Sequence, residues 1–235
     1  MTAVPQSKQY NITHIQQRFN WDCGVTCILM ILSSSQRKQF LNNFESICKD
    51  EGFGVSTWTI DLCYLLLRYH VRHEYYTQTI GVDPSYKKHS YYSHVLDKDE
   101  KRVMRRFKEA PGKGLRIQQR TVNMHGIVMH LARHGPIILL TNASQLICEV
   151  CRRTIREKFG FHLFCFAQNK NKSFAGHYVV LCGYDAEAHT IFYNNPETRD
   201  GHTCRCSPAS MDTARTAFGT DQDIIFIFEK SKRKK

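Results

Sequence analysis

Cys23 is the residue in this sequence with the clearest potential for covalent chemistry. It is preceded by Asp22, and the apolar residues Val25, Ile28 and Leu29 follow at helical spacing. This pattern predicts that Cys23 lies in the first turn of a buried helix, with Asp22 as its N-cap. Free N–H groups and the positive end of the helix macrodipole favour an anion there, so we expect Cys23 to react as a thiolate.

Three other polar residues can complete a catalytic group around this thiol. Gln17, six residues before Cys23, carries an amide that can donate a hydrogen bond to developing negative charge. His177 begins one predicted strand and Asn195 follows the next, and a hairpin would bring them together although 18 residues separate them. His177 would accept the thiol proton, and the Asn195 side-chain oxygen would hold the imidazole in one tautomer. Asn194 is a weaker candidate, because strand alternation places it on the opposite face.

The order and spacing of these residues resemble those of papain-like cysteine peptidases, in particular the branch that processes bacteriocin leaders. The resemblance implies that Cys23 is the nucleophile and that Gln17, with the Cys23 backbone N–H, forms the oxyanion hole. It also implies that His177 and Asn195 complete the triad, although that branch usually has Asp where Asn195 stands and papain itself has Asn. Taken singly, each residue also has a structural interpretation: a buried cysteine, a core histidine and an Asn-Pro turn.

Over most of its length the chain resembles a eukaryotic family called guanylyl cyclase domain-containing proteins. The segments that carry the resemblance are Ile80-Gly81-Val82-Asp83 with the Tyr-rich loop after it, Asp99-x-x-Arg102-Val103, and Gly135-Pro136-Ile137. The family has the same papain-like layout, and its name implies the conversion of GTP to cyclic GMP.

The residues themselves offer little for such a cyclase. The sequence has no GxxxxGK[ST] phosphate loop, and a cyclase of the well-understood kind needs paired carboxylates for two metal ions. The nearest carboxylates, Asp97, Asp99 and Glu100, lie on a charged segment for which a solvated helix face is the better interpretation. Guanylyl cyclase activity is therefore kept as an alternative, and a non-catalytic interaction module that retains the fold is another.

Several cysteines raise the question of a metal site. Cys148-x2-Cys151 and Cys204-x-Cys206, with His202 beside the second pair, offer enough ligands for zinc. A single CxxC without a second one at matching spacing is a weak signal, and ordinary reduced cysteines are favoured. We therefore expect no metal and no cofactor.

Composition limits the classes of protein further. The chain has 235 residues, a formal net charge of +12 and 10 Cys, but no secretory signal pattern and no apolar run of about 18 residues that could span a bilayer. The thiols are therefore expected to be reduced, in a cytoplasmic or nuclear protein. The charge favours an acidic partner, yet no nucleic-acid-binding motif accompanies it, so a protein or peptide substrate is expected.

The predicted fold is α+β: a papain-like cysteine peptidase fold in which N-terminal helices pack on a mainly antiparallel sheet from the C-terminal half. We expect one domain over residues 1–235, with a flexible arm at 1–13, a basic insertion at 142–175 and a basic tail at 230–235. Hydrophobic periodicity predicts one helix bearing Phe40, Phe44 and Ile47, one capped by Ser56 or Thr57, and two more over 97–110 and 121–133. Strands are expected over 71–79, 137–141, 176–185, 190–194 and 223–228, with a loop over 81–94.

Overall fold

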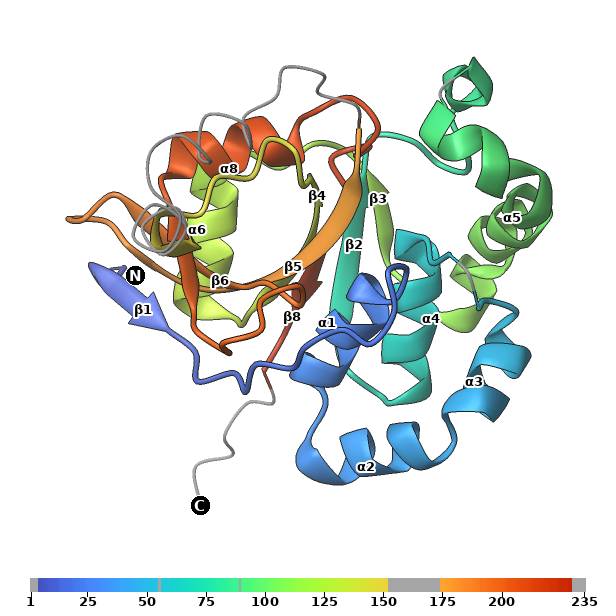
Figure 1. Cartoon of the computed structure of the whole chain (residues 1–235), viewed down its shortest axis with the longest axis horizontal. Helices are drawn as coiled ribbons and strands as arrows, with labels where there is room; N and C mark the ends of the chain where they lie inside the picture. Colours follow the sequence, from blue (N-terminus) through green and yellow to red (C-terminus); the bar gives the residue numbers. More distant parts are fainter. Residues whose placement is uncertain (1–3, 55, 89, 152–173, 230–235) are drawn as a thin grey trace.

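The computed structural model describes residues 4–54, 56–88, 90–151 and 174–229 (Figure 1). The helices are α1 Cys23–Ile31, α2 Ser34–Asn42, α3 Phe44–Glu51, α4 Thr59–Arg68, α5 Ser90–Glu109, α6 Met124–Arg133 and α8 Pro208–Arg215, with short 3-10 turns at Pro84–Lys88 and Pro111–Lys113. The strands are β1 Ser7–Gln9, β2 His73–Thr77, β3 Ile117–Gln119, β4 Ile137–Asn142, β5 Gly176–Asp185, β6 Thr190–Asn194, β7 Cys204–Cys206 and β8 Ile224–Ile227. None of the helices in this described part is both long and apolar enough to cross a membrane.

The strands form one mixed sheet in the order β3-β2-β8-β4-β5-β6-β7, with β1 paired to the end of β5. Only β2 and β3 pair in parallel among the described strands; all the other pairs are antiparallel. The α+β class and the mainly antiparallel sheet are therefore confirmed. The sheet also draws β1, β2 and β3 from the first half of the chain: β2 lies within the strand predicted over 71–79, whereas β1 and β3 were not predicted.

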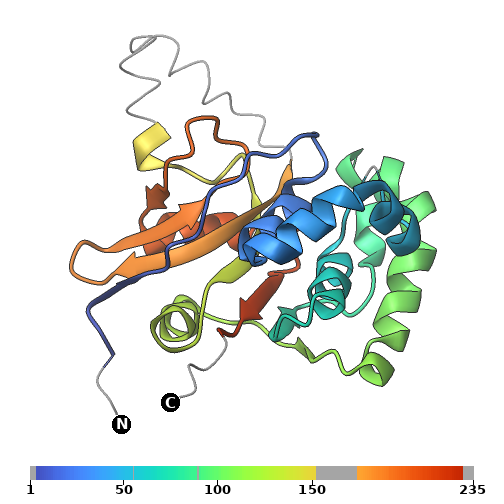
Figure 2. The same ribbon diagram turned by 90° about the horizontal axis from the view of Figure 1, so that it is seen from below.

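Both faces of the sheet are covered by helices, so its central strands are apolar on both sides (Figures 1 and 2). Along β4, Ile138 and Leu140 face a core shared with α1 and α4, whereas Ile137 and Leu139 face a second core shared with α6 and α8. The helices α1 to α5 thus lie on one side and α6 and α8 on the other. The predicted arrangement placed helices of the first half against the sheet; the layer of α6 and α8 is an addition.

Several predicted helix boundaries were wrong. Phe40, Phe44 and Ile47 belong to two helices and not to one, because the helical conformation is interrupted at Asn43, between α2 and α3. The helix α4 begins at Thr59, not after Ser56 or Thr57, and the Asp61 carboxylate accepts the Trp58 N–H at 2.9 Å. The helix α5 begins at Ser90, inside the segment expected to be a loop.

Asp99 is buried, which contradicts the interpretation of its helix face as solvated. Only 3% of the residue is exposed, and its carboxylate lies 2.8 Å from Arg102. Arg102 also reaches Asp61 of α4 at 3.0 Å, and Arg106 reaches Asp61 at 3.1 Å. Sequence patterns missed this network because it needs α4 and α5 to be packed side by side. The two arginines give both buried carboxylates an ion-pair partner.

The amino-terminal segment is partly ordered by the sheet, in contrast to the flexible arm expected for residues 1–13. Ser7–Gln9 form β1 against β5, where a side chain on Gly183 would lie 2.3 Å from the Lys8 carbonyl oxygen. Glycine is therefore required at this crossing. Residues 152–173 of the predicted insertion at 142–175, and the whole predicted tail at 230–235, lie outside the described residues.

Candidate functional site

Cys23 is the first residue of α1, as the sequence predicts, and its residue is 7% exposed. Asp22 occupies the N-cap position but makes no side-chain capping bond to the helix. Its carboxylate instead accepts the backbone N–H groups of Arg18 and Phe19, at 3.2 Å and 3.1 Å. Asp22 therefore fixes the loop before the helix, and the capping role predicted for its side chain was wrong.

Gly24 allows the start of α1 to approach β5 closely. A Cβ atom at this position would lie 2.9 Å from the Tyr178 ring and 3.0 Å from Leu62 of α4. Tyr178 follows His177 on β5, so the lack of a side chain at Gly24 is what brings Cys23 to the strand that carries the histidine. The packing explains why glycine follows the cysteine in the sequence.

His177 lies on β5 with Asn195 behind its ring. His177 Nε2 is 2.7 Å from Asn195 Oδ1, and the Glu197 N–H donates to the same oxygen at 2.9 Å. Because that oxygen accepts from Glu197, its bond with the ring requires Nε2 to be the protonated nitrogen of the neutral imidazole. Nδ1 is then the ring nitrogen left free to accept a proton.

Cys23 is the second partner of His177. Burial lowers the pKa of His177, but the hydrogen bond and the charge of the adjacent Cys23, followed by the bond to Asn195, outweigh burial and raise the pKa above its ordinary value. The net direction favours the imidazolium form of His177. The structure thus brings together three of the four residues named from the sequence.

Gln17 lies next to this group through its backbone. The Gln17 N–H donates to the Pro196 carbonyl at 2.8 Å, which ties the loop before α1 to the turn that carries Asn195. The side-chain Nε2 donates to the Phe19 carbonyl at 2.9 Å, while Oε1 is buried with no hydrogen-bond partner among the described residues. One N–H of the amide is therefore already used, and its role as an oxyanion donor stays a prediction.

The two neighbouring asparagines at the end of β6 have side chains with different partners. The Asn194 side chain donates to the Ile12 carbonyl at 3.0 Å, on the opposite side from His177, in agreement with strand alternation. The Asn195 carbonyl interacts with His14 Nε2 at 2.8 Å and with the Thr198 hydroxyl at 2.9 Å. These contacts hold the backbone of Asn195 while its side chain faces the histidine.

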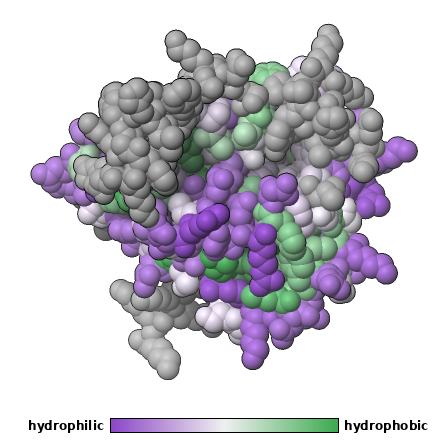
Figure 3. Space-filling view, in the orientation of Figure 1, coloured by the Kyte–Doolittle hydropathy of each residue, from purple (hydrophilic) through white to green (hydrophobic). Residues whose placement is uncertain are grey.

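A cavity of about 910 Å³ is lined by the loop that precedes Cys23 and by the segment where α2 ends and α3 begins. Phe19, Trp21 and Phe44 line it, and the rings of Phe19 and Trp21 stack at a centroid distance of 5.7 Å. Phe19 is 47% exposed. The face shown in Figure 3 is mostly hydrophilic, with apolar surface over its helical half. An open aromatic surface is thus present only a few residues from the candidate nucleophile.

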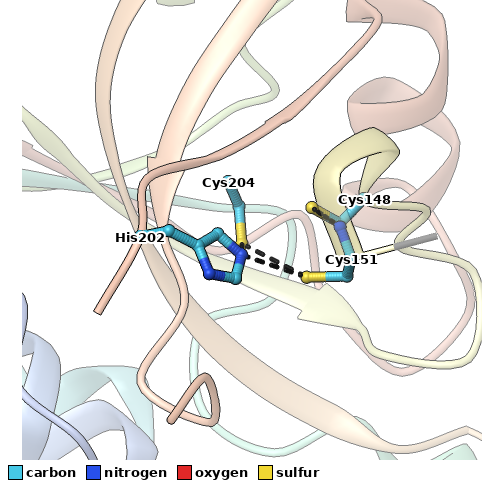
Figure 4. A group of neighbouring side chains, drawn as sticks. All are labelled: Cys148, Cys151, His202 and Cys204. Carbon is cyan, nitrogen blue, oxygen red and sulfur yellow. Dashed lines mark hydrogen bonds between the residues drawn. The ribbon is translucent and has the colours of Figure 1, made fainter. Parts of the chain in front are cut away.

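A second group of reactive side chains forms elsewhere, where the sequence favoured ordinary reduced cysteines. Cys148, Cys151, His202 and Cys204 come together, with all their ligand atoms within 4.8 Å of one another (Figure 4). Cys206, the other cysteine considered for this group, is buried in the same core but is not among these four residues. The available signal was His202-x-Cys204 as a ligand pair matching Cys148-x2-Cys151.

Comparison with known proteins places the chain in a family. A family described as guanylylate cyclase matches residues 12–227, a span that includes Cys23, His177 and Asn195. The chain is also 34% identical over 227 residues to a protein named guanylyl cyclase 1 from Arabidopsis thaliana, a match that covers 96% of this chain and 78% of that protein. On both comparisons, the chain belongs to the guanylyl cyclase family that these matches define.

Proposed function

We propose that this protein is a thiol hydrolase of papain-like layout that cleaves an amide or ester, with Cys23, His177 and Asn195 as its triad. The observation that carries the proposal is the position of His177 between the Cys23 thiol and the Asn195 oxygen, the latter at 2.7 Å. A nucleophile beside a base, with the base oriented by a third group, is the arrangement that nucleophilic catalysis needs. Cys23 is far from His177 and Asn195 in the sequence, so the convergence of these three residues is a property of the fold.

The chemistry follows from the assigned tautomer. His177 Nδ1 takes the thiol proton, and the Cys23 sulfur adds to the substrate carbonyl carbon. The oxyanion is held by the Cys23 backbone N–H and the Gln17 amide. The tetrahedral intermediate collapses as the bond to the leaving group breaks and His177 returns the proton to that group, leaving a thioester on Cys23. Water then adds with His177 as base, and the acid product leaves with the thiol restored.

The arrangement of elements supports the papain-like layout. The nucleophile starts a helix on one side of the sheet, the base lies on a sheet strand, and the third residue follows the adjacent antiparallel strand. The helical half and the sheet half meet at this point. Trp21 and Phe19, beside the loop before Cys23, offer an apolar surface on which a peptide side chain can pack.

Guanylyl cyclase activity is the second candidate, and the name of the Arabidopsis relative and the family description favour it. Cyclisation of GTP needs oxygen ligands for Mg²⁺ or Mn²⁺ beside the triphosphate. Asp22 is engaged with backbone N–H groups, and Asp61 and Asp99 are paired with Arg102. Among the described residues, the one group of three or more potential metal ligands is made of sulfur and imidazole. The geometry therefore supports the hydrolase better.

The two candidates are separated by one set of variants tested in two assays. We expect iodoacetamide to label Cys23 of the wild type fastest among the thiols, as read by site-resolved mass spectrometry, and His177→Ala to slow that labelling. Cys23→Ala should lose the fast label, while Cys48→Ala, which removes a partly buried thiol outside the triad, should keep it.

Equal labelling of Cys23 in the wild type and in His177→Ala would reduce Cys23 to an accessible thiol and refute the hydrolase. The same proteins are incubated with GTP and Mn²⁺ and assayed for cyclic GMP. Cyclic GMP formation that survives both Cys23→Ala and His177→Ala would support the cyclase. If the wild type shows neither fast labelling of Cys23 nor formation of cyclic GMP, the protein is a non-catalytic member of the family.

A further inference from the structure

Four side chains from two distant segments form a compact group at the edge of the sheet. Cys148 and Cys151 lie after β4, where helical residues begin at 149, and His202 and Cys204 lie just before and at the start of β7 (Figure 4). Cys151 Sγ is 3.4 Å from His202 Nε2 and 3.8 Å from Cys204 Sγ, and Cys204 Sγ is 3.7 Å from His202 Nε2. Each residue directs one potential ligand atom to a shared centre.

These distances are those of a tetrahedral zinc site. With Zn–S near 2.3 Å and Zn–N near 2.0–2.1 Å, a tetrahedron places two sulfurs about 3.8 Å apart and a sulfur and a nitrogen about 3.6 Å apart. The observed separations of 3.8, 3.4 and 3.7 Å agree with these values. A disulfide would instead need the sulfurs about 2.05 Å apart. The thiols are therefore spaced for a shared ion and not for a bond between Cys151 and Cys204.

Groups around the cluster are placed to stabilise a thiolate. The Cys151 N–H donates to Cys148 Sγ at 3.3 Å. The hydroxyl of Tyr193 is buried beside Cys148, and among the described residues it has no hydrogen-bond partner other than that sulfur. A buried hydroxyl donor needs a good acceptor, and a thiolate at Cys148 would supply a better one than a neutral thiol. Metal-bound thiolates commonly receive such bonds from surrounding donors.

We propose that Cys148, Cys151, His202 and Cys204 bind one Zn²⁺ ion in a structural site. Three thiolates and one imidazole form a ligand set that suits zinc and disfavours the hard cations Mg²⁺ and Ca²⁺. All four tetrahedral positions are filled by protein, so no position is open for water or substrate, as is typical of structural zinc. The site does not depend on the hydrolase proposal, because none of its ligands belongs to the triad.

The ion would fasten the edge of the sheet near the candidate active site. It joins the segment after β4 to the start of β7, the edge strand paired with β6. His202 lies seven residues after Asn195, which the turn after β6 presents to His177. Glu149 and Arg205 connect the same two segments by an ion pair at 3.6 Å, which is partly exposed and therefore weak. Zinc would supply the stronger connection.

Metal analysis of the full chain tests the proposal. Protein purified without chelators should contain about one zinc per chain by elemental mass spectrometry. Cys151→Ser and His202→Ala each remove a ligand and should lower the affinity for zinc at least tenfold, so that the zinc content falls below that of the wild type. His202→Cys should keep the zinc, because four cysteines also form a structural site. Cys206→Ala is the matched control: it removes a buried cysteine of the same strand and should leave zinc content unchanged.

Cobalt provides a second measurement that does not depend on the folding of a variant. Wild-type protein reconstituted with Co²⁺ should show the intense visible absorption of a tetrahedral site with thiolate charge transfer. Wild-type protein with no zinc and no such spectrum would overturn the proposal. So would unchanged zinc content in both Cys151→Ser and His202→Ala, or a disulfide between Cys151 and Cys204 found in peptide mass maps.

Discussion

Two regions of this protein use cysteine and histidine, and their surroundings give them different chemistry. In one, a single sulfur meets His177, and the far side of the ring is held by the oxygen of Asn195 at 2.7 Å. In the other, His202 meets two sulfurs at 3.4 and 3.7 Å, with Cys148 nearby. An amide behind the ring leaves one nitrogen free to move a proton, whereas several sulfurs around a ring make a cage for a cation. The number of sulfurs and the identity of the ring's other partner thus separate a reactive thiol from a structural one.

The largest expected effect comes from removing the metal. A strong chelator should lower the melting temperature, measured by calorimetry, by about 10 °C, because structural zinc contributes several kcal/mol and each kcal/mol shifts a chain of this size by about 2–4 °C. Cys23→Ser should melt within about 2 °C of the wild type and should respond to the chelator in the same way. If Cys23→Ser abolished the response to the chelator, the two regions would not be independent.

Replacing Asn195 tests the orientation of the ring. Asn195→Ala should slow iodoacetamide labelling of Cys23 by up to about 100-fold. Displacement of a reactive group by about 1 Å reduces a rate by a factor of that size. Asn195→Asp should restore most of the rate, since a carboxylate can accept the same Nε2 proton. Zinc content should stay at the wild-type level in both variants. A rate that Asn195→Ala leaves unchanged would remove Asn195 from the triad.

A methyl group at Gly24 should push α1 away from β5. Gly24→Ala places a Cβ atom 2.9 Å from the Tyr178 ring, and overpacking of this kind costs about 1–3 kcal/mol in the free energy of unfolding. Denaturant titration measures the loss, and slower labelling of Cys23 should accompany it. Gly112→Ala, where no atom lies within 4 Å of the new Cβ, is the control and should change neither quantity.

The smallest effect concerns Asp223, buried on the Cys23 side of the sheet. It accepts the Tyr75 hydroxyl at 2.8 Å and the Thr59 hydroxyl, and burial, followed by the charge of Asp221, raises its pKa to about 7. The folded state keeps a proton that the unfolded chain releases near pH 4, so the free energy of unfolding should fall as the pH rises from about 4 to about 7.

Asp223→Asn should flatten that decline, as measured by denaturant titrations across the same pH range. The exposed Asp200→Asn variant is the control and should keep the wild-type slope. An equal slope in the wild type and in Asp223→Asn would show that the carboxyl titrates normally in the folded protein.

Local signals in the sequence were sufficient for the elements that carry the triad. Cys23 opens α1 because the apolar spacing after it is helical, and β5 and β6 form a hairpin because their connection is short. The side-by-side position of His177 and Asn195 follows from that hairpin alone. The contact of Cys23 with His177 needed the resemblance to a known layout, because no local rule connects residues so far apart.

Features that depend on packing between distant segments were not predictable. Asp99 is buried with Arg102, which also pairs with Asp61 of α4, and charge patterns along one helix contain no information about a second helix. His202 joins the cysteine cluster only because β7 pairs with β6, whereas Cys206, two residues after Cys204 on the same strand, is not part of the cluster. Spacing along the chain could not distinguish these two residues as ligands.

The central place of β8 has a consequence for biosynthesis. Ile224–Ile227 lie between β2 and β4, and they contribute Ile225 to one core and Ile224 to the other. Neither core can close until this late segment has left the ribosome, and until then β2 and β4 present unpaired edges to other chains. Nascent protein should therefore depend on chaperones until this segment has been made, and a stop codon before Ile224 should yield aggregated product even though every proposed catalytic and zinc-binding residue has been made.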